Sequence, residues 1–271
     1  MSAGAPILLI GAGRMGGALL RGWARHKLGP VIAVDNAPST ELKAFAKKHH
    51  VALFSSTTAI SSLRARACVV ALKPQILKTE IGGLAPIAQS GALMLSIAAG
   101  TSIKTMMAAW GREARIVRAM PNTPGAIGRG ITALYADKGA TRADVALAGK
   151  LLDALGETVW VDRETDIDAV TAVSGSGPAY VFLLVEALAD AAEAEGLARP
   201  LAEKLARATI TGAGALLDAD PSPPDALRRA VTSPKGTTEA ALKILMRSNG
   251  QSALMRRAVA AARARARELG S

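Results

Sequence analysis

The sequence is poor in aromatic residues and has almost no cysteine. Its 271 residues include three Phe, two Tyr, three Trp and one Cys, although 50% are hydrophobic. The core must therefore be built from Ala, Leu, Val and Ile. The one cysteine, Cys68, lies in an apolar run and can form no internal disulfide, which favours a cytoplasmic location.

Long uninterrupted hydrophobic runs are also absent. None reaches the roughly 18 residues that a membrane-spanning helix needs, so we expect no membrane partner. The apolar stretch from Ile7 is interrupted by Arg14, and no basic residue precedes it, which argues against a signal peptide.

Acidic residues are in the minority, and the formal net charge is +11. The basic residues are scattered, apart from Arg256–Arg257 and a run of Arg263, Arg265 and Arg267. No aromatic residues are interleaved to stack on bases, so we expect a solvated surface and no nucleic-acid partner. The positive field would favour small phosphate and carboxylate ligands.

The first half of the chain alternates short apolar runs with helical stretches. Such runs, bounded by Gly, Pro or polar residues, predict buried parallel strands joined by crossover helices. The predicted strands are Ile7–Ile10, Val31–Val34, Val51–Phe54, Cys68–Leu72, Leu93–Ile97, Ile116–Ala119, Ile131–Tyr135 and Thr158–Val161. The last two flank a helix at about Ala143–Leu155, and the whole predicts an α/β Rossmann-like doubly wound sheet.

From about Asp166 the apolar residues recur only at helical spacing. The predicted helices are Pro178–Glu195, Leu201–Leu217, Asp225–Val231, Thr238–Met246 and Ser252–Leu269. We therefore expect a dinucleotide-binding domain over residues 1–165 and an all-α domain over residues 166–271. The Ala-rich helices around residues 180–217 are apolar on more than one face, which predicts burial against a second copy in a homodimer.

A glycine-rich motif follows the first predicted strand. Gly11, Gly13, Arg14, Met15 and Gly16 form part of a GxGxxG turn that opens a helix, where backbone can approach a pyrophosphate closely. The alternative is a merely structural turn. An acidic residue ends the second strand 19 residues after the last glycine, at Asp35. The combination predicts NADPH or NADH as the cofactor.

The choice between the two cofactors stays open. Asp35 could bond the ribose 2′-hydroxyl and would repel a 2′-phosphate, which favours NADH. Asn36, Ser39 and Thr40 could instead donate to a phosphate. If the second strand ended one residue later, Asn36 would occupy the discriminating position.

Three further segments should face the cofactor at the ends of strands. Lys73 precedes Pro74, which imposes an extended backbone there; a solvated lysine after a strand is the alternative. Small residues around Ala98 leave room for a nicotinamide ring. Asn122, in a loop between two prolines, offers a neutral donor and acceptor.

Two serine-rich segments are candidates for substrate binding. Ser174–Pro178 and Ser233–Glu239 each precede a predicted helix, whose N-terminal N–H groups attract an anion such as a carboxylate. Each serine or threonine could equally be a simple N-cap.

Groups for acid–base or metal chemistry are missing from the predicted crevice. His26, His49 and His50 lie outside its loops, and no metal-ligand spacing is present, so we expect no metal. Carbonyl reduction usually needs an acid or a Lewis acid, whereas an iminium already carries the charge that accepts hydride. The sequence therefore favours reduction of a C=N bond in a small, carboxylate-bearing cyclic imine.

Taken together, these loops resemble the pyrroline-5-carboxylate reductase family. The matching segments, in the family's order, are Gly11–Gly16, Ala71–Pro74, Ser96–Gly100, Arg118–Pro124, Ala169–Tyr180 and Thr232–Ala240. The resemblance implies reduction of 1-pyrroline-5-carboxylate to L-proline with NADPH or NADH, the last step of proline biosynthesis. It also implies a C-terminal helical dimerisation domain and often a decamer of five dimers.

The resemblance also implies roles for particular residues. Thr238 would hydrogen-bond the ring nitrogen and act in catalysis. The expected substrate-binding residues are Glu164, Ser174, Gly175, Ser233, Gly236, Thr237 and Thr238. The expected cofactor-binding residues are Gly11, Gly13, Arg14, Met15, Gly16, Asp35, Asn36, Thr58, Leu72, Lys73, Pro74, Ala98 and Asn122.

Three positions depart from the family's pattern. Lys235 stands where glycine is common and would add a cation near the substrate carboxylate. Thr58 and Ala230 stand where some members have asparagines that contact the cofactor.

Two other functional classes compete with this interpretation. Hydroxyacid dehydrogenases with a helical second domain need an acid, typically a lysine, on the long helix, and residues 178–195 contain none. A non-catalytic NADP-sensing module would leave the Ser233–Thr238 segment without a purpose.

Overall fold

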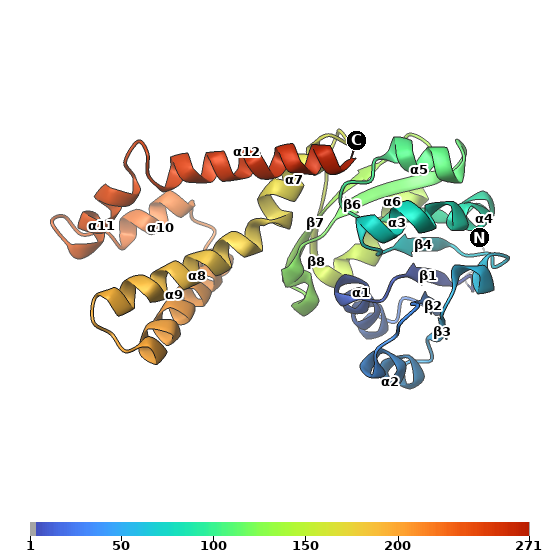
Figure 1. The fold of residues 1–271 in the computed structure, drawn as a ribbon, viewed down its shortest axis with the longest axis horizontal. Coiled ribbons are helices and arrows are strands. Elements are labelled where there is room, and N and C mark those ends of the chain that lie inside the picture. The colour runs from blue at the N-terminus through green and yellow to red at the C-terminus, as the bar shows by residue number, and fades with distance from the viewer. Residues whose placement is uncertain (1–3, 271) are drawn as a thin grey trace. The chain divides into compact units, whose positions relative to one another are not determined.

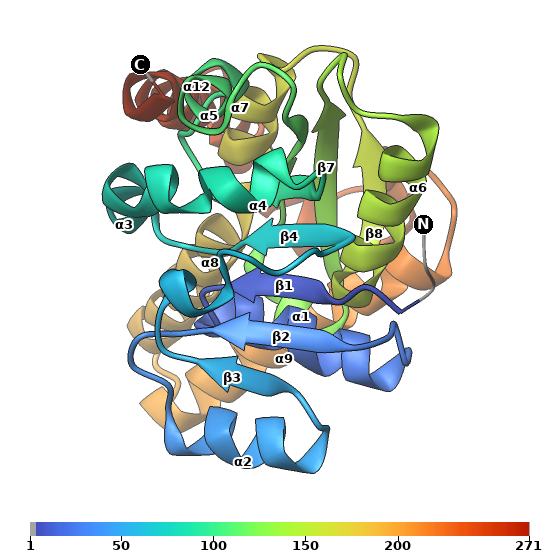
Figure 2. The same cartoon turned by 90° about the vertical axis from the view of Figure 1, so that its right-hand side faces the viewer.

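The first part of the chain forms an eight-stranded sheet in a computed structural model that describes residues 4–270. The strand order is β3-β2-β1-β4-β5-β6-β7-β8, and Figure 2 shows β3, β2, β1 and β4 side by side. The strands are β1 (Ile7–Ile10), β2 (Val31–Val34), β3 (Ala52–Phe54), β4 (Ala67–Val70), β5 (Leu93–Ser96), β6 (Arg115–Met120), β7 (Gly130–Ala136) and β8 (Gly156–Trp160). The predicted Rossmann-like sheet is confirmed, with strand ends displaced by one or two residues.

One strand pair runs against the predicted parallel pattern. β6 and β7 are antiparallel, whereas every other neighbouring pair is parallel. Only a short 3-10 turn, η3 (Thr123–Ile127), joins them. A parallel return needs a crossover of a dozen or more residues, so this connection can only reverse the chain.

Helices cover both faces of the sheet because the strands bury alternate side chains on each side. Ile7 and Leu9 of β1 pack towards α1, α2 and α6, while Leu8 and Ile10 pack towards α3, α4 and α5. The helices of this part are α1 (Arg14–Arg25), α2 (Thr40–Lys48), η1 (Thr57–Ile60), α3 (Pro74–Glu80), η2 (Ile81–Leu84), α4 (Ala85–Gln89), α5 (Ile103–Trp110), α6 (Arg142–Leu152) and η4 (Asp153–Leu155). The double coverage explains why the central strands β1 and β4 are apolar throughout.

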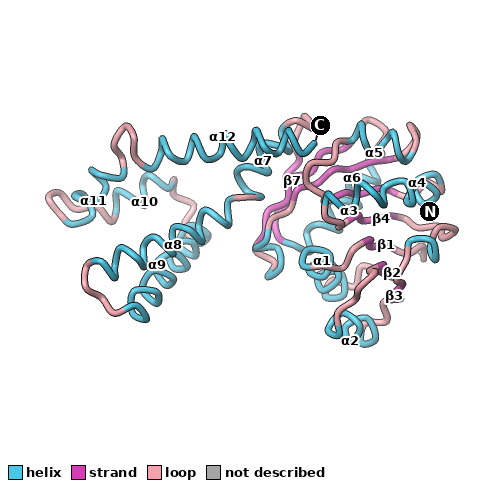
Figure 3. The backbone as a smooth tube through the Cα atoms, in the orientation of Figure 1, coloured by secondary structure: helices cyan, strands magenta, loops and turns pink. Residues whose placement is uncertain are grey.

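The rest of the chain is helical, as Figure 3 shows by colour. Its elements are α7 (Asp166–Val170), the π-helical turn η5 (Thr171–Gly175), α8 (Gly177–Ala194), α9 (Arg199–Ala219), α10 (Pro224–Ala230), α11 (Thr237–Leu245) and α12 (Gln251–Gly270). Contacts divide the chain into two compact units, and the second is Ser176–Ala261. The first therefore extends to Gly175 and takes in the end of α12, a different division from the predicted one at residue 165.

The long helices α8 and α9 lie side by side (Figure 1). Both leave apolar side chains exposed. On α8, Phe182 is 60% exposed and Leu183 is 63% exposed. The helical stretch Asp166–Ala194 is long and apolar enough to cross a membrane by length and composition, although no uninterrupted apolar run has that length. One such helix is weak evidence of a membrane span, because the core helix of a soluble protein passes the same test.

Candidate active site

A pocket of about 350 Å³ lies at the carboxyl ends of β1, β2 and β4. Its lining is Ile10, Gly11, Gly13, Val34, Asp35, Asn36, Ser55, Ser56, Thr57, Ala71, Leu72, Lys73, Ile76 and Glu80. Ligands of doubly wound sheets bind at this edge. The pocket thus gathers six of the residues predicted for the cofactor, namely Gly11, Gly13, Asp35, Asn36, Leu72 and Lys73.

The glycine-rich turn fits a closely approaching anion. Gly11 has φ +90°, and an added Cβ would lie 2.9 Å from the Ala71 carbonyl oxygen. An added Cβ on Gly16 would overlap the Gly11 carbonyl oxygen. The amides of Gly13, Arg14 and Met15 make no hydrogen bond to residues 4–270. Unpaired N–H groups at the start of α1 are the donors that a pyrophosphate requires.

Asp35 follows directly after β2, and both of its carboxylate oxygens are occupied. Oδ2 accepts from the Ala12 amide at 2.9 Å, and Oδ1 accepts from the Ala37 amide at 3.0 Å. The carboxylate thereby ties the glycine-rich turn to the end of β2. Because β2 ends at Val34, Asn36 does not become the first residue after the strand.

Pro74 begins α3 and Lys73 is its N-cap, with φ −63° and ψ 146°. This is the extended conformation predicted for the residue before proline. Thr58 does not line the pocket; its hydroxyl lies 2.7 Å from the Ser56 hydroxyl. Ser55 and Ser56 do line the pocket, and sequence reasoning missed them although they are polar residues directly after a strand.

Ala98 and Asn122 lie outside this pocket, in loops after β5 and β6. Ala98 is buried, and its amide donates to the Ser96 hydroxyl at 3.3 Å. Oδ1 of Asn122 accepts from the Ile131 amide at 3.0 Å, so this side chain fixes the β6–β7 connection.

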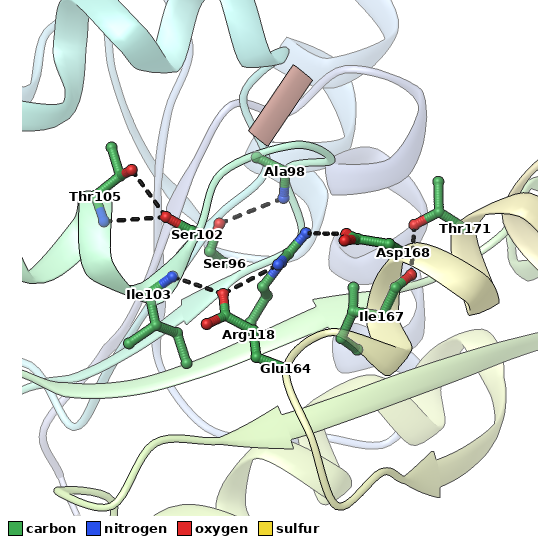
Figure 4. A network of polar contacts seen from close by, with 10 residues as sticks. All are labelled: Ser96, Ala98, Ser102, Ile103, Thr105, Arg118, Glu164, Ile167, Asp168 and Thr171. Atoms are coloured by element: carbon green, nitrogen blue, oxygen red, sulfur yellow. Dashed lines mark hydrogen bonds and ion pairs between the residues drawn. The ribbon is translucent and has the colours of Figure 1, made fainter. Parts of the chain in front are cut away.

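Glu164 lies in the segment between β8 and α7. Its Oε1 accepts from the Arg118 guanidinium at 3.0 Å and from the Ile103 amide at 2.7 Å (Figure 4). Arg118 belongs to β6, and Ile103 begins α5, just after the loop of Ala98. Sequence reasoning gave Arg118 no role, although it begins the segment Arg118–Pro124 that matches the family and is a charged residue within the predicted strand Ile116–Ala119.

Part of the segment before the long helix is itself helical. Residues 171–175 form a π-helical turn, and Ser176 is the N-cap of α8, with Pro178 in the first turn as predicted. The Ser174 hydroxyl donates to the Val170 carbonyl at 3.2 Å, and Gly175 packs against Met120. Helix turns with π geometry are frequent at functional sites.

The segment Ser233–Thr238 forms a tight turn at the start of α11 in the second unit. The Gly236 amide donates to the Ser233 carbonyl at 3.0 Å, and an added Cβ on Gly236 would overlap the Ser233 hydroxyl. Lys235 has φ +60°, a conformation that favours glycine. Its amide donates to Oε2 of Glu239 at 3.1 Å.

The first turn of α11 keeps free donors. Within residues 4–270 the amides of Thr237 and Thr238 make no hydrogen bond, and Gly236 is the N-cap without a side-chain cap. The Thr238 side chain is half-buried. Glu164 and this turn belong to different compact units.

The site contains no metal-binding cluster of His, Cys, Asp or Glu among the described residues. Burial raises the pKa of the Cys68 thiol to about 12, so this thiol is not a nucleophile at neutral pH. Near α7, a hydrogen bond from the exposed Arg163 guanidinium lowers the pKa of Asp166.

Comparison with known proteins decides the family. The model of the pyrroline-5-carboxylate reductase dimerisation domain matches residues 164–269. That of the coenzyme F420-dependent NADP oxidoreductases matches residues 6–100. A pyrroline-5-carboxylate reductase of Pseudomonas aeruginosa is 40% identical over 263 residues, which cover 97% of this chain and 96% of that protein. The chain belongs to the pyrroline-5-carboxylate reductase family.

Solved structures of pyrroline-5-carboxylate reductases share the whole fold. The protein of Coxiella burnetii is 34% identical, with a TM-score of 0.89 over 98% of this chain and 99% of that one. The protein of Plasmodium falciparum, solved with NADP bound, is 27% identical, with a TM-score of 0.84 over 100% of both chains. The resemblance predicted from the loops is thus confirmed, and the matched dimerisation domain supports self-association.

Proposed function

We propose that this chain is an NAD(P)H-dependent reductase that converts 1-pyrroline-5-carboxylate to L-proline, the last step of proline biosynthesis. The observation that carries the proposal is the 40% identity with the Pseudomonas aeruginosa reductase along almost the full length of both proteins. The pocket at the carboxyl edge of the sheet supports it independently, because its glycine cradle suits a dinucleotide.

The cofactor would be held mainly by backbone. The free amides of Gly13, Arg14 and Met15 would bind the pyrophosphate, and Gly11 and Gly16 allow its approach. Leu72, Lys73 and Pro74 border the same edge, and the buried Ala98 leaves space for the nicotinamide ring. When bound, the reduced nicotinamide supplies hydride to the imine carbon.

Both NADPH and NADH would be accepted. Each Asp35 oxygen accepts from one backbone amide and keeps a second lone pair, so the carboxylate could still accept from the ribose 2′-hydroxyl of NADH. Asn36, Ser55 and Ser56 line the pocket and offer neutral donors to either a 2′-hydroxyl or a 2′-phosphate. Thr58 would act only through its contact with Ser56.

The substrate carboxylate would be bound at the start of α11. The unpaired amides of Thr237 and Thr238 and the hydroxyl of Ser233 are suitable donors, and the helix terminus adds positive potential. Lys235 would add a cation, and Gly236 permits the turn. Glu164, Ser174 and Gly175 are proposed to border the substrate on the resemblance alone.

Thr238 would hold the ring nitrogen through its hydroxyl. Electron density moves onto this nitrogen as hydride reaches the carbon. A protonated imine then needs only orientation, whereas a neutral imine needs a proton, which Thr238 could relay from water. Correct placement of reacting atoms can supply several kcal/mol of the barrier.

Self-association would occur through the helical domain as a dimer, with a decamer of five dimers as the finer possibility. The uncovered apolar side chains of α8 and α9 are the surface that a second copy would bury. We further propose that the enzyme is cytoplasmic and has no membrane or nucleic-acid partner. The apolar face of α8 would then be covered by a second copy of the chain.

The deciding experiment is an assay of the purified protein with 1-pyrroline-5-carboxylate and NADPH. We expect loss of NADPH absorbance that depends on the imine and yields L-proline. The same assay with a 2-keto acid is the control, because a hydroxyacid dehydrogenase would consume NADPH only there. Consumption with the keto acid and none with the imine would reject the proposal.

A further inference from the structure

Arg118 places a charge inside an apolar cluster. It lies on β6 opposite Ser96 of β5 and Tyr135 of β7, on the sheet face where Met94 and Ile116 are fully buried. The whole residue is 5% exposed. A charge at such a depth requires compensation by partners of opposite charge.

Two carboxylates provide this compensation, and both come from the chain segment that leaves the sheet (Figure 4). One guanidinium nitrogen lies 3.0 Å from Oε1 of Glu164, and the other lies 3.4 Å from Oδ1 of Asp168 in α7. Oε1 of Glu164 also accepts from the Ile103 amide at 2.7 Å. One cation therefore fixes the end of the β8–α7 segment against the start of α5.

Stability alone does not account for this arrangement. Buried ion pairs are often no more stabilising than well-packed apolar side chains of similar volume. Moreover, Nε of Arg118 is buried and has no hydrogen-bond partner among the described residues, which destabilises the folded state. A group that is costly to keep buried is a candidate for a role in function.

The free atom in the cluster is the second carboxylate oxygen of Glu164. Oε1 is engaged twice, whereas Oε2 makes no hydrogen bond within residues 4–270. The Glu164 side chain is 28% exposed, so it remains open to a ligand. The cluster lies beside the Ser96–Ala98 segment that precedes α5, where the nicotinamide ring is proposed to bind.

We infer that Arg118 is a positioning residue, which holds Glu164 so that Oε2 can accept a hydrogen bond from the bound imine or its amine product. The effect on imine reduction rests on the proposed function, whereas the contacts between Arg118, Glu164 and Ile103 do not depend on it. It assigns Arg118 a place in the reaction through Glu164, without contact of its own with the reacting atoms.

Arg115 offers a matched control on the same strand. Its guanidinium pairs with both oxygens of Asp144 at 2.9 and 3.0 Å, and the Asp144 side chain is 4% exposed. Asp144 belongs to the capping box of α6, away from Glu164. Arg115→Met should lower stability through loss of an ion pair and leave the kinetics of imine reduction unchanged.

The kinetic test is a double-mutant cycle on Arg118 and Glu164. Arg118→Met and Glu164→Gln should each lower kcat/KM for the imine by about tenfold to a hundredfold. In the Glu164→Gln background, Arg118→Met should cost less than about twofold more, because the side chain that it positions has already lost its function. The dissociation constant for NADP⁺ should stay within roughly twofold in every variant.

Arg118→Lys keeps the charge if Arg118→Met fails to fold. A lysine cannot reach both carboxylates as a planar fork does, so kcat/KM should still fall while NADP⁺ binding is retained. Multiplicative losses in the cycle, or an equal loss in Arg115→Met, would overturn the inference.

Hydrogen exchange tests the geometry without relying on activity. The Ile103 amide should exchange faster in Arg118→Met and in Glu164→Ala, but not in Arg115→Met, because Glu164→Ala removes the acceptor and Arg118→Met removes its support. Unchanged Ile103 exchange in Arg118→Met would overturn the positioning role. Inactivity of the wild type towards the imine, with the expected exchange pattern, would instead reject only the proposed function.

Discussion

Asp35 shows how a candidate ribose contact can also support the backbone around it. The sequence leaves its role at the ribose open, and in the structure its two oxygens accept from the amides of Ala12 and Ala37. These bonds stabilise the glycine-rich turn and leave a second lone pair on each oxygen for a ligand.

Asp35→Ser should therefore weaken the turn. We expect a loss of about 1–3 kcal/mol in the free energy of unfolding, since two backbone donors lose a charged acceptor. KM should rise for NADPH and NADH together. Steady-state kinetics with both cofactors check this; a rise in the NADPH/NADH efficiency ratio would show that the carboxylate contacts the ribose.

Thr238 is the residue on which the proposed chemistry depends most. Thr238→Ala should lower kcat/KM for the imine by about tenfold to a hundredfold, the effect of losing one hydrogen bond of 1–3 kcal/mol. Thr238→Ser should keep most activity because the hydroxyl remains. Thr211→Ala, at an exposed position on α9, is the control. Full activity of Thr238→Ala would mean that Thr238 has no catalytic role.

Cys68 gives a prediction about pH. Burial raises its pKa from 9.0 to about 12, so above pH 9 the unfolded thiol ionises while the folded thiol does not. The stabilising contribution is complete below pH 9 and is lost as pH rises towards 12, by about 1.4 kcal/mol per pH unit. Denaturation of wild type and Cys68→Val should diverge in slope above pH 9. The native thiol should resist thiol reagents at pH 8.

At the scale of elements, the packing of α1 against the sheet depends on one glycine. A Cβ on Gly16 would overlap the Gly11 carbonyl oxygen, whereas a Cβ on the adjacent Gly17 would lie 3.4 Å from the Ala12 carbonyl oxygen. The two positions share the same helix and differ in the space around them.

Gly16→Ala should displace the start of α1 and abolish measurable NADPH binding, with a clear fall in Tm. Gly17→Ala should leave NADPH binding within about threefold, because alanine favours helix and meets only ordinary contacts. Calorimetric titration with NADPH and thermal denaturation distinguish the two. Equal NADPH affinity in both variants would contradict the role given to the close approach.

The helical segment between the sheet and α8 contains residues that usually occur in loops. The glycines and serines of Ser174–Gly177 are typical of a loop, yet Ser174 and Gly175 end a π-helical turn, Ser176 is the N-cap of α8 and Gly177 begins that helix. The close approach of Gly175 to Met120 shows why a small residue is needed there. A composition typical of loops also suits a helix that must pack tightly.

At the scale of the whole molecule, the uncovered face of α8 and α9 predicts assembly. Light scattering at micromolar concentration should give at least twice the 27.7 kDa of one chain. Leu183→Glu should shift the mass towards one chain, because a carboxylate would be buried in the interface. Gln89→Glu, an exposed site on the first unit, should not. A single-chain mass for wild type would reject self-association.

Local patterns determined much of this protein. Short apolar runs placed the eight strands, because buried parallel strands must be apolar on both faces. The glycine-rich turn after β1 predicted the nucleotide pocket, and the loops together predicted the family. Turns that require a positive φ favour glycine, as at Gly11, which has φ +90°, so such turns can be recognised in the sequence.

Other features were decided only by the tertiary structure. The reversal between β6 and β7, the binding of Asp35 to Ala12 and the burial of Arg118 between Glu164 and Asp168 each join residues far apart in the chain. Side-chain partners across such distances are set by how helices and strands pack, and a periodic pattern carries no information about them. A carboxylate that the sequence offers as a ribose contact therefore also supports a turn, and an arginine to which the sequence gives no role is paired with two acids.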